Sequence, residues 1–277
     1  MSAKTPVFRW QVNTNGPETY EKIMVPVWTA DWVDDLLSAG MVGPGSRVLD
    51  AACGTGIIAR RAAGVAGPGG RVAALDFNEG MLRVAERCAR DEGITGIGWY
   101  KSDVRAMPFP DRVFDTVICQ QGLQFFPDPA AALREMERVL SPGGRFALSV
   151  WGRFEKCLHV PVICDAFSRW FGEESTAMFK VACSLSDHAV LHDLVEGAGF
   201  QDIRIRTGTK IARHPSLAGL LPEYFSIFPI AEKIGAMPET ERDAMFCSIM
   251  EGLEPYTRDG ALAVPTEGII LSAVKGE

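Results

Sequence analysis

The 277-residue sequence lacks several features that would each point to a class of protein. Lysine and arginine form no cluster, and the formal net charge is −7, so a surface that follows a nucleic-acid backbone is disfavoured. No apolar run approaches the roughly 18 residues that a membrane helix needs. The first residues have no apolar core like that of a secretory signal. We therefore expect a cytoplasmic protein with no nucleic-acid partner and no stable membrane insertion.

Paired cysteines and regularly spaced metal ligands are also missing. The seven cysteines form no CxxC pair, and Cys53 and Cys119 lie in apolar strand-like segments, which predicts reduced, buried thiols. His188 and His192 lie four residues apart on an expected helix, a spacing that suits a metal ion. Because the sequence offers no third ligand beside them, an exposed helix face is the better interpretation, and no metal is predicted.

The sequence does contain a regular alternation of short apolar strands and helices. Hydrophobic residues make up 47% of it and charged residues 23%, values that are typical of a folded globular domain. Five strands are expected, at residues 47–50, 71–75, 97–101, 113–119 and 145–150. Strands separated by helices pair in parallel through right-handed crossovers. The predicted fold class is therefore α/β, with helices on both faces of a parallel sheet.

Helical patterns dominate the rest of the chain. Residues 17–39 carry apolar side chains at helical spacing, with Pro26 as a kink or break. Residues 152–185 and 214–257 also show a helical pattern and are rich in aromatic and methionine residues. A capped helix is expected at 186–197 and strands at 200–209 and 261–274, the last as a strand pair or one bent strand.

The segment with the clearest chemistry is residues 48–59, VLDAACGTGIIA. It places a strand, a glycine turn and a helix start in that order. In open α/β sheets, ligands bind beyond the carboxyl ends of the strands, where glycines let the backbone approach a ligand closely. The spacing Gly54-x-Gly56-x-x-Ala59 also fits a dinucleotide-binding turn, which holds a pyrophosphate at a helix N-terminus.

Asp50, at the end of the strand, favours a different ligand for this turn. At a separation near 4 Å, a carboxylate and a phosphate repel by about 1 kcal/mol in water-like surroundings and by about 4 kcal/mol at an effective dielectric constant of 20. S-adenosylmethionine carries an ammonium and a sulfonium group but no phosphate, so it suits Asp50 better. An NAD-dependent oxidoreductase that uses the same turn is the alternative.

From this turn onward the sequence resembles the class I S-adenosylmethionine-dependent methyltransferases. It is most similar to the subgroup acting on small molecules, which includes ubiquinone and menaquinone ring methyltransferases. The similarity is dense over residues 46–151 and looser over 186–209, and it includes the motifs ALDFNEGML (74–82), KSDVRAMPFPDRVFD (101–115) and SPGGRFALSVW (141–151). The resemblance implies a Rossmann-like seven-stranded sheet whose last strand is antiparallel. Strands four and five would lie on one side of the first strand, and strands two and three on the other.

The resemblance also implies which residues hold the methionine end of S-adenosylmethionine. Asp50, Gly54 and Gly56 would form the turn around it. Ala52 stands in the same turn, where many members of the family carry a glycine, and its methyl group would narrow the site slightly. Gln120 follows the fourth strand, where backbone near the methionine end is expected.

The adenosine end would be held by residues after the second and third strands. Asp76 ends the second strand, and its carboxylate would accept both ribose hydroxyls. Phe77 and Met81 would flank the adenine. Asp103 would accept the adenine amino group, while the amide of Val104 would serve a ring nitrogen.

The family inserts acceptor-binding structure at the places of residues 152–185 and 214–257. Their aromatic and methionine content predicts a helical cap that shapes an apolar acceptor site over the methyl donor. A small second core or a homodimer face is the alternative. The whole chain, 1–277, is expected to form one domain, with an N-terminal helical segment at 17–39 and a cofactor-binding core at 46–151.

Four further residues are candidates for the acceptor site. Tyr20 in the N-terminal helical segment is a candidate lid residue. Gln121, Gln124 and Phe125 follow the fourth strand, where an acceptor could approach, and are expected to form a wall. The predicted function is in-line methyl transfer to a small hydrophobic or aromatic molecule by proximity and desolvation. The sequence identifies no general base.

Overall fold

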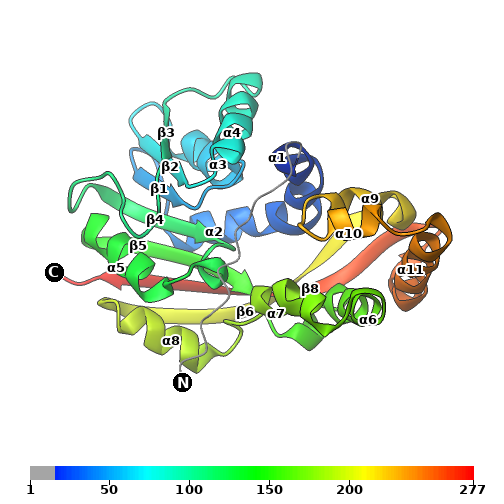
Figure 1. Cartoon of the computed structure of the whole chain (residues 1–277). Helices are drawn as coiled ribbons and strands as arrows, with labels where there is room; N and C mark the ends of the chain where they lie inside the picture. The colour runs from blue at the N-terminus through cyan, green and yellow to red at the C-terminus, as the bar shows by residue number, and fades with distance from the viewer. Residues whose placement is uncertain (1–15) are drawn as a thin grey trace.

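The segments predicted as strands pair into one sheet. In the computed structural model, which describes residues 16–277, the strand order is β3-β2-β1-β4-β5-β8-β6 (Figure 1). The parallel strands are β1 (Arg47–Ala51), β2 (Arg71–Asp76), β3 (Ile97–Lys101), β4 (Phe114–Gln120) and β5 (Leu140–Trp151). The predicted order and the antiparallel last strand are confirmed. The amino-terminal segment, in which no secretory signal is expected, lies outside the described residues.

The last part of the sheet is longer than predicted. β6 (Phe200–His214) and β8 (Ala261–Lys275) pair antiparallel along most of their length, and β8 is one continuous strand. β5 stops where Trp151 faces Gly268, so the remaining residues of β6 and β8 continue as a two-stranded ribbon beyond the sheet. A two-residue strand, β7 (Thr257–Arg258), pairs with β8 near the end of this ribbon.

Alternate residues of the central strands enter two separate cores, because successive side chains of a strand point to opposite faces. In β1, Val48 packs into a core with α2 (Val33–Ala39), α3 (Ile57–Ala66) and α4 (Glu79–Asp91). Leu49 packs on the other face, where α5 (Pro129–Val139) and α8 (His188–Glu196) lie. The sheet is therefore covered on both sides, as its apolar strands predict.

Short polar residues fix where these helices begin. The side chain of Asn78 accepts the N–H groups of Gly80 and Met81 at the start of α4. Asp128 accepts the N–H of Ala131 and caps α5. The strand expected at 145–150 begins earlier, because β5 starts at Leu140 and carries an irregularity in its pairing with β4.

The N-terminal segment is helical throughout the described part. It comprises α1 (Gly16–Thr19), a π-helix η1 (Tyr20–Thr29), a 3-10 turn η2 (Ala30–Trp32) and α2. Pro26 was expected to kink or break the helix, but it lies inside η1 and the helix continues. Proline lacks the N–H group that a helical hydrogen bond requires, so η1 continues past Pro26 without a backbone donor at that residue.

The remaining helices pack with η1 and the β6–β8 ribbon into a third core. They include η4 (Phe154–Lys156), α6 (His159–Phe171), η5 (Glu173–Thr176), α7 (Ala177–Ala182), α9 (Leu217–Ser226), α10 (Ala231–Gly235), α11 (Glu239–Gly252) and η6 (Glu254–Tyr256). In Figure 1 they gather around the outer end of the ribbon, beside α1. Two segments far apart in the sequence, 152–185 and 214–257, thus join the N-terminal helices.

His159 lies buried in this third core as an uncharged ring. It stacks on Trp28 with ring centroids 4.0 Å apart, and burial lowers its pKa to about 3. Its Nδ1 atom has no hydrogen-bond partner in the described chain. The core therefore holds His159 neutral, while the unfolded chain binds a proton there below the ordinary pKa of about 6.5.

We expect His159→Phe to reduce the loss of stability in acid. The stabilisation from a neutral His159 is complete above pH 6.5 and falls by about 1.4 kcal/mol per pH unit as the pH drops toward 3. The phenylalanine ring of the variant can still stack on Trp28 but cannot bind a proton. Between pH 7.5 and pH 5, the wild type should therefore lose about 2 kcal/mol more free energy of unfolding than the variant. Urea denaturation at both pH values measures this difference, and equal losses would contradict it.

Candidate functional site

The glycine turn between β1 and α3 adopts an unusual backbone. Ala52, Gly54 and Gly56 all have positive φ angles, of 60°, 52° and 82°. Such angles are easy for glycine but cost a residue with a Cβ roughly 1–3 kcal/mol, and this strain falls on Ala52. The turn thus keeps a glycine-like shape where the family commonly has a glycine.

Asp50 lies beneath this turn, almost fully buried. Its Oδ2 accepts the N–H of Ala59 in the first turn of α3 at 3.0 Å. Burial raises the pKa of Asp50 to about 7, with a further contribution from the nearby Asp76 charge. The carboxyl group is therefore easily protonated unless a positive charge lies close by.

Asp76 connects the end of β2 to the same turn. Its Oδ2 accepts the N–H of Gly54 at 2.8 Å, and its Oδ1 accepts the N–H of Asn78 at 2.8 Å. Burial raises the pKa of this carboxyl group as well. The two backbone contacts fix the orientation of the carboxylate, and each oxygen keeps a lone pair that can accept a hydroxyl group.

A cavity of about 330 Å³ lies at the carboxyl ends of β1, β2 and β4. Eleven of the fourteen residues predicted for the site line it: Tyr20, Ala52, Gly54, Asp76, Phe77, Met81, Asp103, Val104, Gln120, Gln121 and Phe125. Asp50 lines an adjoining space of about 30 Å³ that shares part of the same wall. The structure therefore brings residues from five separate segments of the chain to one place.

Gly56 and Gln124 lie behind the cavity wall. A Cβ atom on Gly56 would stand 2.9 Å from the ring of Trp99, so this glycine permits close packing of α3 against the sheet. The side-chain amide of Gln124 donates to the side-chain oxygen of Gln121 at 3.0 Å and thereby supports a residue that does line the cavity. Gly56 and Gln124 therefore support the residues of the cavity wall without lining the cavity themselves.

Two residues predicted to hold the adenine lie near the open edge. Asp103 pairs with Arg105 at 2.6 Å, and hydrogen bonding to Arg105 lowers the pKa of the Asp103 carboxyl group. An adenine amino group would therefore share this carboxylate with Arg105. Phe77 is 59% exposed, whereas Met81 is buried.

The sequence pattern missed the other half of the wall. These residues come from η1, the end of β5, α7, α9 and the segment that follows α9. They are mostly apolar: Met24, Thr29, Trp151, Met178, Phe179, Ala182, Tyr224 and Phe228. The aromatic and methionine content of 152–185 and 214–257 predicted that these segments form a cap. It did not identify which side chains of each helix face the cavity, because that depends on contacts between distant segments.

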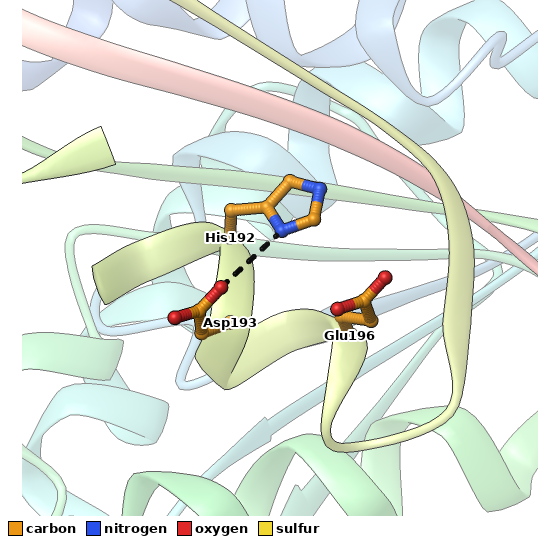
Figure 2. A group of neighbouring side chains, drawn as sticks. All are labelled: His192, Asp193 and Glu196. Atoms are coloured by element: carbon orange, nitrogen blue, oxygen red, sulfur yellow. Dashed lines mark ion pairs between the residues drawn. The ribbon is translucent and has the colours of Figure 1, made fainter. Parts of the chain in front are cut away.

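A separate group of possible metal ligands lies on α8, which does not line the cavity. His192, Asp193 and Glu196 place ligand atoms within 4.8 Å of one another, so His192 has acidic neighbours that spacing alone had not indicated. Figure 2 shows the ion pair between His192 Nδ1 and Asp193 Oδ1, at 3.7 Å. His188 instead contacts the Thr207 hydroxyl at 2.9 Å. These side chains belong to one largely exposed helix surface, and no role follows from their proximity.

Comparisons with known proteins agree with this architecture. A family model described as a methyltransferase domain matches residues 49–148. A ubiquinone/menaquinone biosynthesis C-methyltransferase from Photorhabdus laumondii is 32% identical over 199 residues, covering 66% of this chain and 78% of that protein. The protein of the same name from Yersinia enterocolitica is 32% identical over 213 residues, covering 66% of this chain and 84% of that protein.

The chain belongs to the S-adenosylmethionine-dependent methyltransferases. Its fold also matches a phosphoethanolamine N-methyltransferase from Haemonchus contortus, solved with S-adenosyl-L-methionine, at a TM-score of 0.62 and 19% identity. That match covers 100% of this chain and 60% of the other, and it shows the fold alone. Of the two interpretations of the glycine turn, membership in this family supports the small-molecule methyltransferase and not the NAD-dependent oxidoreductase. Within residues 16–277, no helix has the length and apolar character needed to cross a bilayer.

The chemistry of the turn fits the methyl donor of this family. Asp50 and Asp76 are acids near positions where the donor's positive charge and hydroxyl groups would be recognised, and Gly54 leaves the backbone accessible. Tyr20 lies against the turn, since its Cε1 lies 3.9 Å from where a Cβ on Gly54 would stand. We expect these residues to hold S-adenosylmethionine in this methyltransferase.

The affinity of the methyltransferase for S-adenosylmethionine should depend on the ionisation of Asp50. Because a cationic ligand favours the carboxylate, binding should release a proton when the pH lies below about 7, the pKa of Asp50. The Kd should weaken as the pH falls from 8 to 6, by at most tenfold per pH unit below 7. Calorimetry in buffers of different ionisation enthalpy measures both effects. An Asp50→Asn variant with the same pH dependence as wild type would contradict this role.

Asp76→Ala should weaken the binding of S-adenosylmethionine by about 1.5–3 kcal/mol, the usual value of hydrogen bonds to a charged group. Asp76→Asn keeps an oxygen that can accept the N–H of Gly54, so it tests how much of the loss comes from the ribose and how much from the turn. Asp111→Asn is the matched control, because this carboxylate does not line the cavity and pairs with Arg138 at 2.7 Å. A Kd unchanged by Asp76→Ala would show that the ribose lies elsewhere.

Proposed function

We propose that this methyltransferase acts on a small, uncharged hydrophobic or aromatic acceptor. The observation that carries the proposal is the composition of the cavity wall opposite the glycine turn. The residues that line it are Met24, Trp151, Met178, Phe179 and Phe228, from η1, β5, α7 and the segment after α9. The helices of 152–185 and 214–257 would then serve as the predicted cap over the methyl donor, since both contribute to this wall.

The charges around the cavity support an uncharged acceptor. Among the described lining residues there is no lysine or histidine, and the one arginine, Arg105, already pairs with Asp103. A carboxylate or phosphate on the acceptor would therefore enter an apolar space without a free cation to balance it, which is costly. An apolar ring or chain gains instead from burial against the methionine and aromatic side chains.

The chain contributes positioning and exclusion of water to the reaction. S-adenosylmethionine supplies an activated methyl group on its sulfonium when bound. The ordered turn and Asp76 would fix its place, while the apolar wall aligns the acceptor and keeps water out. Tyr20 cannot serve as a base near neutral pH, because burial and the Asp76 charge raise its pKa to about 12. Burial raises the pKa of Tyr224 as well, so its hydroxyl also stays protonated.

A paired panel of aromatic acceptors tests this proposal. Each uncharged compound, such as 1-naphthol or 1-naphthylamine, is compared with a counterpart that carries a carboxylate or sulfonate on the same ring. The protein is incubated with S-adenosylmethionine, and S-adenosylhomocysteine and methylated product are measured by mass spectrometry. We expect turnover with uncharged members and little with their charged counterparts. Turnover confined to the charged compounds would contradict the proposal, and Asp76→Ala provides the control for donor-dependent activity.

A further inference from the structure

Gln120 is the last residue of β4, and it borders two connected parts of the site. It lines the main cavity, and together with Asp50 and Gly54 it also lines the smaller adjoining space beside the glycine turn. The apolar wall, which includes Trp151 and Phe228, lines the same main cavity. Gln120 therefore contacts both the space beside the turn and the cavity proposed for the acceptor.

The backbone at Gln120 is fixed by the centre of the sheet. Gln120 pairs in parallel with Ser149 of β5, and the N–H of the next residue, Gln121, donates to the Ser149 carbonyl at 2.9 Å. The chain turns immediately afterwards, because Gln121 has a positive φ of 54°. A side chain that begins on a paired strand holds its position better than one on a loop.

A hydrogen bond to η1 fixes the orientation of the Gln120 amide. Its Nε2 donates to the Thr29 carbonyl at 2.9 Å. Because a carbonyl can only accept a hydrogen bond, the amide atom that faces Thr29 must be the nitrogen. The amide oxygen, Oε1, is the other end of the same planar group, so this bond directs it away from Thr29.

The Oε1 atom of Gln120 is open to a ligand. It accepts no hydrogen bond within residues 16–277, and the side chain is only partly buried. The buried side-chain atoms that lack a partner in this part of the chain do not include it, so Oε1 keeps an accessible surface beside the cavity that Gln120 lines.

The two other glutamines after β4 differ in this respect. The Nε2 of Gln124 donates to the Oε1 of Gln121 at 3.0 Å. The remaining amide atoms of this pair, Gln121 Nε2 and Gln124 Oε1, are enclosed in the protein. Of the three glutamines, Gln120 therefore offers the accessible hydrogen-bond acceptor.

The expected contacts of S-adenosylmethionine leave this oxygen available to the methyl acceptor. The ammonium group of the donor is best matched by the Asp50 carboxylate, since a charged acceptor binds it more strongly than an amide oxygen does. The ribose hydroxyls are expected at Asp76, and the adenine amino group at Asp103. The sulfonium group has no N–H or O–H to donate. A hydrogen bond to Gln120 Oε1 then comes from the acceptor.

We infer that Gln120 is a specificity-determining residue whose side-chain oxygen accepts a hydrogen bond from an uncharged hydroxyl or N–H group of the methyl acceptor. This inference rests on the proposed function, because it places an uncharged acceptor in the main cavity. The neutral amide takes no proton, so Gln120 selects and orients the acceptor. A molecule of similar shape without such a group leaves Oε1 unpaired and binds more weakly.

A pair of naphthalenes tests this inference. 1-Naphthol and 1-methoxynaphthalene share one ring system and are uncharged at neutral pH, but only 1-naphthol has a hydroxyl that can donate. Calorimetry measures the Kd of each for the full-length protein saturated with S-adenosylhomocysteine. We expect wild type to bind 1-naphthol more tightly. Gln120→Met should weaken the binding of 1-naphthol about threefold to tenfold, the usual contribution of a neutral hydrogen bond, and leave that of 1-methoxynaphthalene nearly unchanged.

Gln201→Met is the matched control, because it removes the same amide from β6, outside the cavity wall. It should change neither Kd. Equal losses for both naphthalenes in Gln120→Met would show that the amide only supports packing, and would overturn the inference. A wild-type protein without a preference for 1-naphthol, or a preference that survives in Gln120→Met, would overturn it as well. Thermal unfolding confirms that each variant is folded.

A second pair of ligands determines whether Gln120 holds the donor instead. S-adenosylhomocysteine and 5′-methylthioadenosine share the adenosine, but only the former carries the ammonium group. If Gln120→Met weakened only the binding of S-adenosylhomocysteine, the oxygen would belong to the donor; the inference would then be wrong while the proposed acceptor class stands. A wild-type protein that binds S-adenosylhomocysteine but neither naphthalene would overturn the proposed function, and the inference with it.

Discussion

The hydrogen bond from the N–H of Gly54 to the carboxylate of Asp76 holds the site together. It joins the glycine turn after β1 to the end of β2, two segments that are 22 residues apart. The same carboxylate also takes the N–H of Asn78, whose side chain caps α4. One buried acid thereby sets the shape of the turn, the start of a helix and the position of its own free lone pairs. Removal of the Asp76 carboxylate therefore affects the turn, the start of α4 and the free lone pairs together.

The rest of the cavity depends on the length of two strands. β6 and β8 continue past the end of β5, and the ribbon that they form carries the helices of the third core. This core brings Phe179 and Tyr224 to the same wall as the turn, although the two residues belong to segments separated by a whole helix and strand. The sheet thus supplies the acidic, glycine-rich side of the cavity, and the ribbon supplies the apolar side.

Electrostatics inside the site is dominated by burial. Burial raises the pKa of both Asp50 and Asp76, and the Asp76 charge raises that of Asp50 further. Arg60 lies buried beside Thr55 and is engaged by Glu21 and Glu92. A donor with positive charge relieves the cost of holding two carboxylates together. The site is therefore arranged for a cation on one side and for uncharged surroundings on the other.

The central fold and the acidic half of the site could be predicted from the order of residues along the chain. Alternating strands and helices allow few topologies, and residues at the ends of parallel strands meet at one edge, so Asp50, Gly54 and Asp76 could be placed from their positions alone. The residues of the apolar half, including Met178, Tyr224 and Phe228, could be identified only from the tertiary structure. Helical periodicity shows that a helix has an apolar face, but it does not show which partner covers that face. That choice follows from the extension of β6 and β8 and from the packing of η1, which join segments far apart in the chain.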